Sequence, residues 1–373
     1  MGRSQIPRLV LSGAPEARGR RYGALAAGRI AVSLASYRTM FETCGISWSD
    51  AQRRASAFAG EMERGFPTAL AELEGVAHGS GVPIASLLAL NARTELLPAD
   101  YLSRAGGAAG STITECTSFA AVGAEDDVWL AQNWDWIGSQ RAALVLLDVR
   151  PDDGPRFMTL AEAGMLAKVG MNEYGFGITL NILRSVEDGR RLGMPTHVLL
   201  RALLDCRDVA EARAFAAAQR YSASSNVLMA DAGGAIASLE HSPRGASFIG
   251  AREFGGRPGL CHTNHFLHPD QRGLEADLDA NLSTVPRLEA AIELLGAGPM
   301  TRERAQALLS DTRDGLNSIC RFPDPKLPAA ARVETVASVV MNLTQRRMWV
   351  SPEQPTVSEY VESQLPSRAE ERV

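Results

Sequence analysis

One cysteine stands where the character of the chain changes. Residues 97–114 are rich in Gly, Ala, Ser and Thr and lack hydrophobic periodicity, which is typical of a solvent-reachable loop. Directly after Cys116, residues 118–122 and 128–136 have the composition of two short strands joined by a polar loop. A thiol at such a junction could become the first residue of a new chain.

The thiol of Cys116 could carry out that release without another protein. It can attack the carbonyl carbon of Glu115, and hydrolysis of the resulting thioester leaves a free α-amine on Cys116. The pKa of an α-amine is about 7.7 to 8.0, so the amine can act as general base for the thiol of the same residue. The alternative, from spacing and composition alone, is a small buried hydrophobic residue.

Five separated motifs resemble, in the same order, the acyl-coenzyme A:6-aminopenicillanic acid acyltransferase (isopenicillin N acyltransferase-like) family of self-cleaving N-terminal nucleophile (Ntn) hydrolases. The resemblance extends from about residue 6 to about residue 355, nearly the whole chain. The motifs are Leu90-Asn91-Ala92-Arg93-Thr94-Glu95, Cys116-Thr117-Ser118-Phe119 with Gln132-Asn133-Trp134-Asp135, Glu162-Ala163-Gly164-Met165-Leu166-Ala167-Lys168-Val169-Gly170-Met171-Asn172, His262-Thr263-Asn264-His265, and Ser318-Ile319-Cys320-Arg321.

The resemblance implies an α+β fold, a four-layer α-β-β-α sandwich with a mostly helical N-terminal segment wrapped around it. Residues 1–115 would form an α-subunit that stays bound after self-cleavage, and residues 116–373 the catalytic β-subunit. The mature protein would then be an α/β heterodimer made from one precursor.

The resemblance also implies roles for individual residues. Cys116 would be the nucleophile both in self-cleavage and in forming an acyl-enzyme. The amide of Asn264 would donate a hydrogen bond to the tetrahedral oxyanion, and the hydroxyl of Ser118 would assist proton transfer. Without the resemblance, Asn264 is typical of a turn and Ser118 of a strand.

The carboxylate of Asp135 lies between two tryptophans at the end of an apolar strand, where it needs a partner. The resemblance implies that this partner is Arg321 and that the pair orients the new amine. The alternative is a salt bridge at the protein surface. Glu115 stands where the best-known family member has Gly, yet we expect cleavage because the side chain of Glu115 is not a reactant.

Three histidines, His262, His265 and His268, have a spacing that suggests a metal site, with Cys261 beside them. No further carboxylate or cysteine completes the set, and the role of Asn264 accounts for the motif. We therefore favour an enzyme without metal or cofactor. Adjacent side chains on an extended segment point to opposite faces, which argues against a thiol and imidazole pair at Cys261 and His262.

The composition is that of an ordinary globular protein, with 45% hydrophobic residues and a net charge of −5. This charge, with no basic patch interleaved with aromatics, argues against a nucleic-acid partner. No stretch approaches the ~18 to 20 apolar residues of a membrane span, and the N-terminus lacks the apolar run of a signal peptide. The five cysteines are an odd number at wide spacing, which favours a reducing, cytoplasmic location.

The hydrophobic pattern predicts a mostly helical first 110 residues, then strands, a helical block, strands, helices and strands. Such an order fits two sheets with helices outside them. The expected helices cover 20–37, 49–65, a stretch from 67, 84–96, 195–206, 209–220, 284–295 and 301–310. The remaining expected strands cover 6–12, 142–149, 156–162, 166–171, 177–183, 225–230, 235–240, 260–266, 333–343 and 347–351, before a charged tail.

The sequence thus predicts a self-activating amidohydrolase or acyltransferase that cleaves or forms amide bonds through a thioester at Cys116. Its substrate would be a small-molecule amide or an acyl-CoA. A second hypothesis is a non-catalytic, uncleaved protein that keeps the fold and serves as a scaffold or binds a small molecule.

Overall fold

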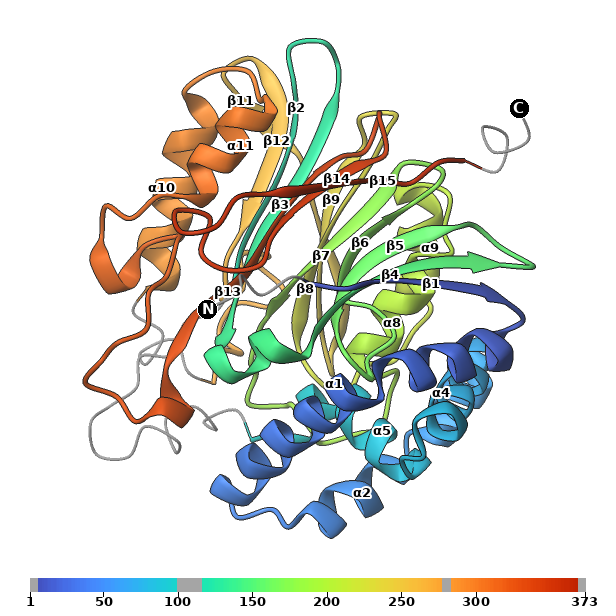
Figure 1. Ribbon diagram of the computed structural model, residues 1–373. Helices are drawn as coiled ribbons and strands as arrows, with labels where there is room; N and C mark the ends of the chain where they lie inside the picture. The colour runs from blue at the N-terminus through green and yellow to red at the C-terminus, as the bar shows by residue number, and fades with distance from the viewer. Residues whose placement is uncertain (1–5, 99–115, 277–282, 368–373) are drawn as a thin grey trace.

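The computed structural model describes residues 6–98, 116–276 and 283–367, and two β-sheets form its centre (Figure 1). One sheet has eight strands in the order β1-β4-β5-β6-β7-β8-β9-β10, and all its pairings are antiparallel except that of β1 with β4. Its strands are β1 (Arg8–Gly13), β4 (Leu144–Pro151), β5 (Phe157–Glu162), β6 (Val169–Asn172), β7 (Phe176–Ile182), β8 (Ser225–Asp231), β9 (Ile236–Ser242) and β10 (Gly245–Gly250).

The other sheet has seven strands in the order β11-β12-β2-β3-β13-β14-β15, and every neighbouring pair is antiparallel. Its strands are β2 (Thr117–Val122), β3 (Val128–Ile137), β11 (Arg252–Phe254), β12 (Arg257–His262), β13 (Val333–Asn342), β14 (Arg347–Ser351) and β15 (Val361–Gln364). β2 therefore lies inside the sheet, between β12 and β3.

The two sheets face each other across a buried core, and helices cover the outer face of each (Figure 1). Helices α8 (Thr196–Leu203) and α9 (Val209–Ala217) and the N-terminal helices cover the eight-stranded sheet, whereas α10 (Thr284–Gly296) and α11 (Arg302–Leu309) cover the other. Residues of β3 alternate between these cores: Leu130 and Trp134 face the opposite sheet, and Ala131 faces α10 and α11. The predicted four-layer α-β-β-α sandwich is confirmed.

The N-terminal helices are α1 (Pro15–Thr43), α2 (Trp48–Ser56), α3 (Ala59–Gly65), α4 (Pro67–Ser80), α5 (Ile84–Asn91) and α6 (Arg93–Leu96). The long helix α1 packs along α4, and glycines on both helices let the two backbones touch. A Cβ atom on Gly79 would lie 2.0 Å from the carbonyl oxygen of Arg20, and one on Gly23 would lie 2.3 Å from that of Val76. The strand β1 joins this segment to the eight-stranded sheet.

Most predicted elements are present, with differences at their ends. The expected helix 20–37 begins earlier, at Pro15, because proline fits the first turn of a helix. The expected helix 49–65 is divided into α2 and α3. The expected strand 260–266 ends at His262, which places Asn264 in the loop that follows. The expected tail contains the short strand β15, and the strands β10 and β11 were not predicted.

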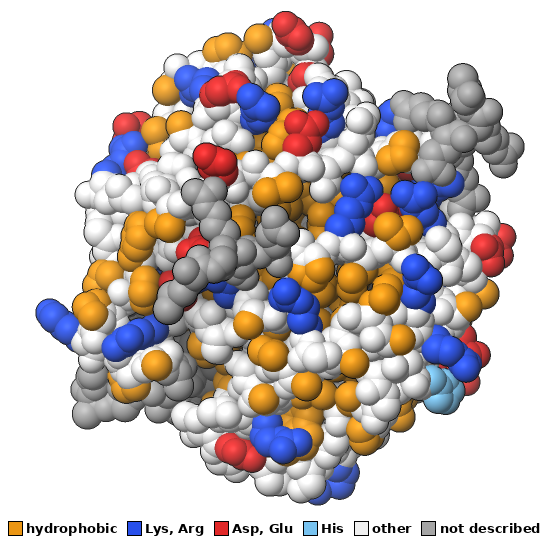
Figure 2. Space-filling view, in the orientation of Figure 1, with side chains coloured by type: hydrophobic (Ala, Val, Ile, Leu, Met, Phe, Trp, Pro, Cys, Tyr) orange, Lys and Arg blue, Asp and Glu red, His pale blue; other side chains and the backbone are white. Residues whose placement is uncertain are grey.

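Lys and Arg side chains are interspersed with Asp and Glu over the face of the molecule drawn in Figure 2. Within the described part of the chain, none of the helices combines the length and apolarity needed to cross a membrane.

Candidate active site

Cys116 directly precedes the internal strand β2, and its side chain belongs to the core between the sheets. Strand β2 pairs Thr117 with Asn133 on β3, so continuing the same antiparallel register brings Cys116 opposite Trp134. The cysteine is only 5% exposed. The predicted cleavage partner Glu115 lies outside the described residues, as does the rest of the 99–115 segment.

Two side chains hold the carbonyl oxygen of Cys116. The guanidinium of Arg287 on α10 donates to it at 2.9 Å, and the amide of Asn181 on β7 donates at 3.0 Å. Arg287 also donates to the hydroxyl of Thr117 at 3.0 Å. These contacts fix the backbone at the start of β2 from the helix α10 and from the opposite sheet, so the position of the thiol is set by the fold as a whole.

Asn264 lies next to the same arginine. Its Oδ1 accepts a hydrogen bond from Arg287 at 3.0 Å, and its Nδ2 donates to the carbonyl oxygen of Ile182 at 2.9 Å. The backbone N–H of Asn264 donates to the hydroxyl of Thr284 at the start of α10. A side-chain amide has two N–H donors, and Arg287 fixes the orientation of this one by binding its oxygen.

Ser118 begins a chain of polar side chains that crosses from one sheet to the other. Its hydroxyl donates to Oδ1 of Asn181 at 2.6 Å, and Asn226 on β8 donates to the same oxygen at 3.1 Å. Asn226 in turn accepts a hydrogen bond from Ser238 on β9. Because each of these groups is buried, the hydrogen bonds offset the cost of removing them from water.

Asp135 and Arg321 are both buried, and Thr335 contacts both of them. The hydroxyl of Thr335 donates to Asp135 at 2.7 Å and accepts from the backbone N–H of Arg321 at 2.9 Å. Burial lowers the pKa of Arg321 to about 9, even though the nearby carboxylate of Asp135 favours its charged form. The two groups therefore interact electrostatically and also share the hydroxyl of Thr335.

A buried ionic cluster lies between the sheets on the Trp134 side of the site. Lys168 Nζ and Glu162 Oε2 form an ion pair at 2.8 Å, and the ammonium of Lys168 lies 3.6 Å from the centre of the Trp134 ring. The guanidinium of Arg93 lies over the ring of Trp136 at 4.5 Å. Lys168 and Arg93 hold the pKa of Glu162 below its usual value, against the opposing effect of its burial.

The histidine motif has a structural role at the end of β12. His262 Nε2 lies 2.7 Å from Oε1 of Glu240 on the opposite sheet, whereas Cys261 faces the helices α10 and α11. The two side chains thus lie on opposite faces, as predicted. Within the described ranges, no group of three or more His, Cys, Asp and Glu side chains is arranged to hold a metal ion.

A cavity of about 600 Å³ lies between the N-terminal helices and the segment that follows β7. Its apolar wall includes Phe58 and Leu97, and Leu97 also belongs to the buried cluster that contains Cys116. The carboxyl residues Glu95 and Asp188 also line the cavity. Burial raises the pKa of Glu95 to about 7. The size and mixed lining are typical of a small-molecule site.

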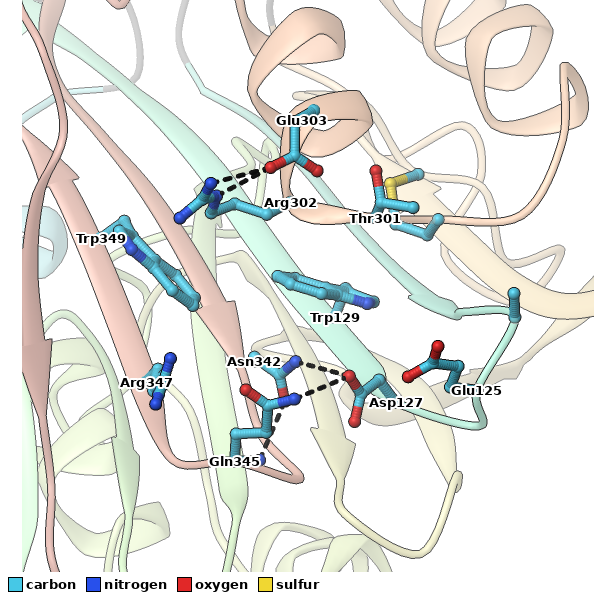
Figure 3. Close-up of a pocket in the computed structure, with 12 residues that line it drawn as sticks. Glu125, Asp127, Trp129, Thr301, Arg302, Glu303, Asn342, Gln345, Arg347 and Trp349 are labelled. Carbon is cyan, nitrogen blue, oxygen red and sulfur yellow. Dashed lines mark hydrogen bonds and ion pairs between the residues drawn. The ribbon is translucent and has the colours of Figure 1, made fainter.

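A second cavity, of about 320 Å³, lies on the outer face of the seven-stranded sheet (Figure 3). Trp129 and Trp349 line it with ring centres 6.1 Å apart, and Arg302 lies beside the Trp349 ring. Trp129 pairs with Ala121, at the far end of β2 from Cys116. None of the predicted site residues lines this cavity, so it is separate from the candidate active site.

The structure thus brings Ser118 and Asn264 to Cys116 through the shared partners Asn181 and Arg287. Arg321 and Arg287 both donate to the hydroxyl of Ser283, and Asp135 joins them through Thr335. Sequence reasoning missed Arg287 and Asn181, which make the direct contacts to Cys116. Asn181 could have been noticed in the sequence, because it is a polar residue within the otherwise apolar predicted strand 177–183.

Two opposed sheets with helices on their outer faces form the α-β-β-α sandwich of the N-terminal nucleophile hydrolase fold. A sequence profile of the family "acyl-coenzyme A:6-aminopenicillanic acid acyl-transferase" matches residues 122–356, and this chain belongs to that family. The matched range includes Asp135, Asn264 and Arg321 and begins shortly after Cys116.

The chain is also similar to individual proteins. The chain is 28% identical over 263 residues to the acyl-coenzyme A:6-aminopenicillanic-acid-acyltransferase 40 kDa form of Emericella nidulans, covering 70% of this chain and 69% of that protein. Among solved structures, penicillin V acylase from Agrobacterium tumefaciens gives a TM-score of 0.44 at 18% identity, over 64% of this chain and 83% of that one. A variant of conjugated bile acid hydrolase from Clostridium perfringens gives 0.44 at 10% identity, over 68% and 98%.

Proposed function

We propose that this protein is a cysteine amidohydrolase or acyltransferase that cleaves its own chain before Cys116 and then transfers acyl groups through a thioester at that residue. The observation that carries the proposal is the anchoring of the Cys116 carbonyl by Arg287 and Asn181. Anchoring this residue at its carbonyl keeps the start of β2 in place when the peptide bond on its amino side is broken.

In the first reaction the thiolate of Cys116 attacks the carbonyl carbon of Glu115. The C–N bond between the two residues breaks, the nitrogen takes up a proton, and a thioester links the two fragments. Water then hydrolyses the thioester, which yields a carboxylate on Glu115, a free thiol and a free α-amine. Residues 1–115 and 116–373 become separate chains that stay together as a heterodimer.

In the second reaction the α-amine takes the proton of the thiol, and the thiolate attacks the acyl carbonyl of a substrate. Asn264 donates to the oxyanion, and Arg287 supports it by holding the amide oxygen. The leaving amine or thiol departs with a proton, and water or an acceptor amine releases the acyl group from Cys116. We assign Ser118 to the proton transfer, and Asp135 with Arg321 to orienting the new chain end.

The substrate we propose is a small-molecule amide or an acyl-CoA whose acyl group has apolar character. The cavity between the N-terminal helices and the segment after β7 supports this choice through its volume of about 600 Å³ and its apolar wall. The name of the Emericella nidulans relative makes acyl-CoA with 6-aminopenicillanic acid the first donor and acceptor to test. We also propose that the protein acts in the cytoplasm, as the sequence predicts.

An acyl-donor panel tests the proposal. The purified protein is incubated with acyl amides and acyl-CoAs, with and without an acceptor amine, and the Cys116 peptide is analysed by mass spectrometry. We expect an acyl adduct on Cys116 and its absence in Cys116→Ala, with the acceptor amine separating transfer from hydrolysis. If no donor of either class acylates Cys116, the non-catalytic hypothesis replaces this one.

A further inference from the structure

The cluster of Lys168, Glu162 and Arg93 is buried and has no part in the reaction steps described above. Lys168 comes from the segment just before β6, Glu162 ends β5, and Arg93 begins α6 of the N-terminal segment. Lys168 and Arg93 are 2% exposed and Glu162 is fully buried. Burying three ionisable groups costs free energy that only ion pairing and hydrogen bonds can offset, so the cluster calls for an explanation.

The cluster adjoins the nucleophile through one tryptophan. The register of β2 and β3 brings Cys116 opposite Trp134, and directly opposed residues have Cβ atoms about 4.5 to 5.5 Å apart. Lys168 Nζ lies 3.6 Å from the centre of the same tryptophan ring. Cys116 and Trp134 also share one buried core. The cation of Lys168 and the side chain of Cys116 therefore both lie beside Trp134 in the core between the sheets.

The cluster carries a net positive charge. Lys168 and Arg93 supply two cations and Glu162 one anion. Tyr37 on α1 donates a hydrogen bond to Glu162.

Other titratable groups lie around the cluster and around Cys116. Burial and the two cations keep the pKa of His197 on α8 well below its usual value, so His197 is neutral. Burial raises the pKa of Glu95 to about 7, and Arg287 on α10 adds a further cation on the carbonyl side of Cys116.

We propose that Lys168 is a positioning residue that acts on Cys116 through its charge and stabilises the thiolate needed for self-cleavage. Before cleavage Cys116 has no α-amine, so its proton must pass to water while a nearby cation stabilises the sulfur anion. The thiolate then forms the bond to the Glu115 carbonyl carbon as described above. Arg93 supports the same charge from the N-terminal segment. The inference rests on the proposed role of Cys116 as nucleophile.

The ionisation of Lys168 is compatible with this role. Burial lowers the pKa of Lys168 to about 8, while Glu162 and the Cys116 sulfur act in the opposite direction. The ammonium is therefore charged below about pH 8. The stabilisation of the thiolate is present at neutral pH and fades as the pH rises through that value.

Three substitutions separate a charge effect from a packing effect. Lys168→Met removes the cation but keeps the length of the side chain, Lys168→Arg keeps the cation, and Glu162→Gln removes the anion but keeps an oxygen for Tyr37 and Lys168. The pH dependence of iodoacetamide alkylation of Cys116 is measured by mass spectrometry. The uncleaved peptide and the peptide that begins at Cys116 differ in mass, so the thiol pKa is read for each form.

We expect Lys168→Met to raise the thiol pKa by about one unit or more and to slow self-cleavage about tenfold at neutral pH. Lys168→Arg should stay near the wild type. Because Glu162 helps Lys168 to keep its proton, Glu162→Gln is combined with Lys168→Arg, whose guanidinium stays charged. This variant should shift the thiol pKa downward, opposite to Lys168→Met, although both disturb the same buried cluster. A shared direction of shift in these two variants, or no shift in either, overturns the inference.

The same measurement keeps the two proposals apart. If the wild-type protein gives only the uncleaved peptide, self-cleavage fails, yet the thiol pKa of that peptide still reports the charge effect. If Lys168→Met does not fold, the direction of the shift in Glu162→Gln combined with Lys168→Arg decides the matter alone.

Discussion

At the scale of single residues, Arg287 connects the groups around Cys116. It donates to the carbonyl oxygen of Cys116, to the hydroxyl of Thr117 and to the amide oxygen of Asn264. By binding the side-chain oxygen of Asn264, Arg287 fixes the direction in which the NH2 group of that amide points. An asparagine held in this way is suited to stabilising an oxyanion without reorganising during the reaction.

Asn264→Asp tests this arrangement. Aspartate keeps an oxygen for Arg287 but removes the N–H donors, so we expect kcat to fall by about 10² to 10³, with the fold intact. Asn264→Ala should show a similar fall in kcat because it also lacks the donor. Circular dichroism confirms the fold of both variants. Near wild-type turnover in Asn264→Asp would show that the residue only supports Arg287.

Sequence reasoning singled out Cys116 but not the residues that hold it. Cys116 and Ser118 belong to a local motif that could be recognised. Arg287 lies within the predicted helix 284–295, where an arginine is typical of a solvated helix face, and its partner Cys116 is 171 positions away. Such a contact depends on how α10 docks onto the sheet, which hydrophobic periodicity does not specify.

At the scale of elements, the contact between α1 and α4 depends on glycine. A Cβ atom on Gly79 would lie 2.0 Å from the carbonyl oxygen of Arg20, and one on Gly75 would lie 2.2 Å from that of Glu16. Backbone atoms cannot give way as the end of a flexible side chain can, so a methyl group must push the helices apart. This packing places α5 and α6, with Asn91 and Arg93, against the two sheets.

We therefore expect Gly79→Ala to lower the free energy of unfolding by about 1 to 3 kcal/mol. Gly28 provides a matched control on α1, because a Cβ atom there meets no atom within 4 Å. Gly28→Ala should be neutral or stabilising by up to about 1 kcal/mol, since alanine favours a helix. Urea denaturation of both variants measures the difference, and equal stabilities would contradict the close packing.

The elements that sequence patterns predicted best are the buried ones. Strands β2, β3, β8, β9 and β13 lie close to their predicted ranges because their apolar residues have few other conformations that bury them. The strands β10, β11 and β15 were missed since they lie at sheet edges, are partly exposed and carry little hydrophobic pattern. The sequence pattern also missed that β12 ends at His262. This end is what places Asn264 in a loop.

At the scale of the whole molecule, the N-terminal segment is part of one folded unit with the rest of the chain. Arg201 on α8 forms a buried ion pair with Glu72 on α4 at 2.9 Å. Tyr22 on α1 donates to the carbonyl oxygen of Met165 and accepts from the N–H of Gly164. The strand β1 completes an edge of the eight-stranded sheet. Breaking one peptide bond removes none of these contacts.

We therefore expect the fragments 1–115 and 116–373 to stay associated after cleavage. Size-exclusion chromatography in native buffer should give one peak containing both fragments, and only a denaturant should separate them. Tyr22→Phe, which loses two buried hydrogen bonds, should lower the denaturant midpoint of dissociation. Elution of the free fragments as separate peaks in native buffer would contradict this arrangement.

The most direct test of the account is the covalent state of the bond between Glu115 and Cys116. Intact mass and N-terminal sequencing of the purified wild-type protein should reveal two chains, the second starting at Cys116, whereas Cys116→Ala should remain a single chain. A wild-type chain that is continuous through this bond, yet fully active on amides, would contradict the account.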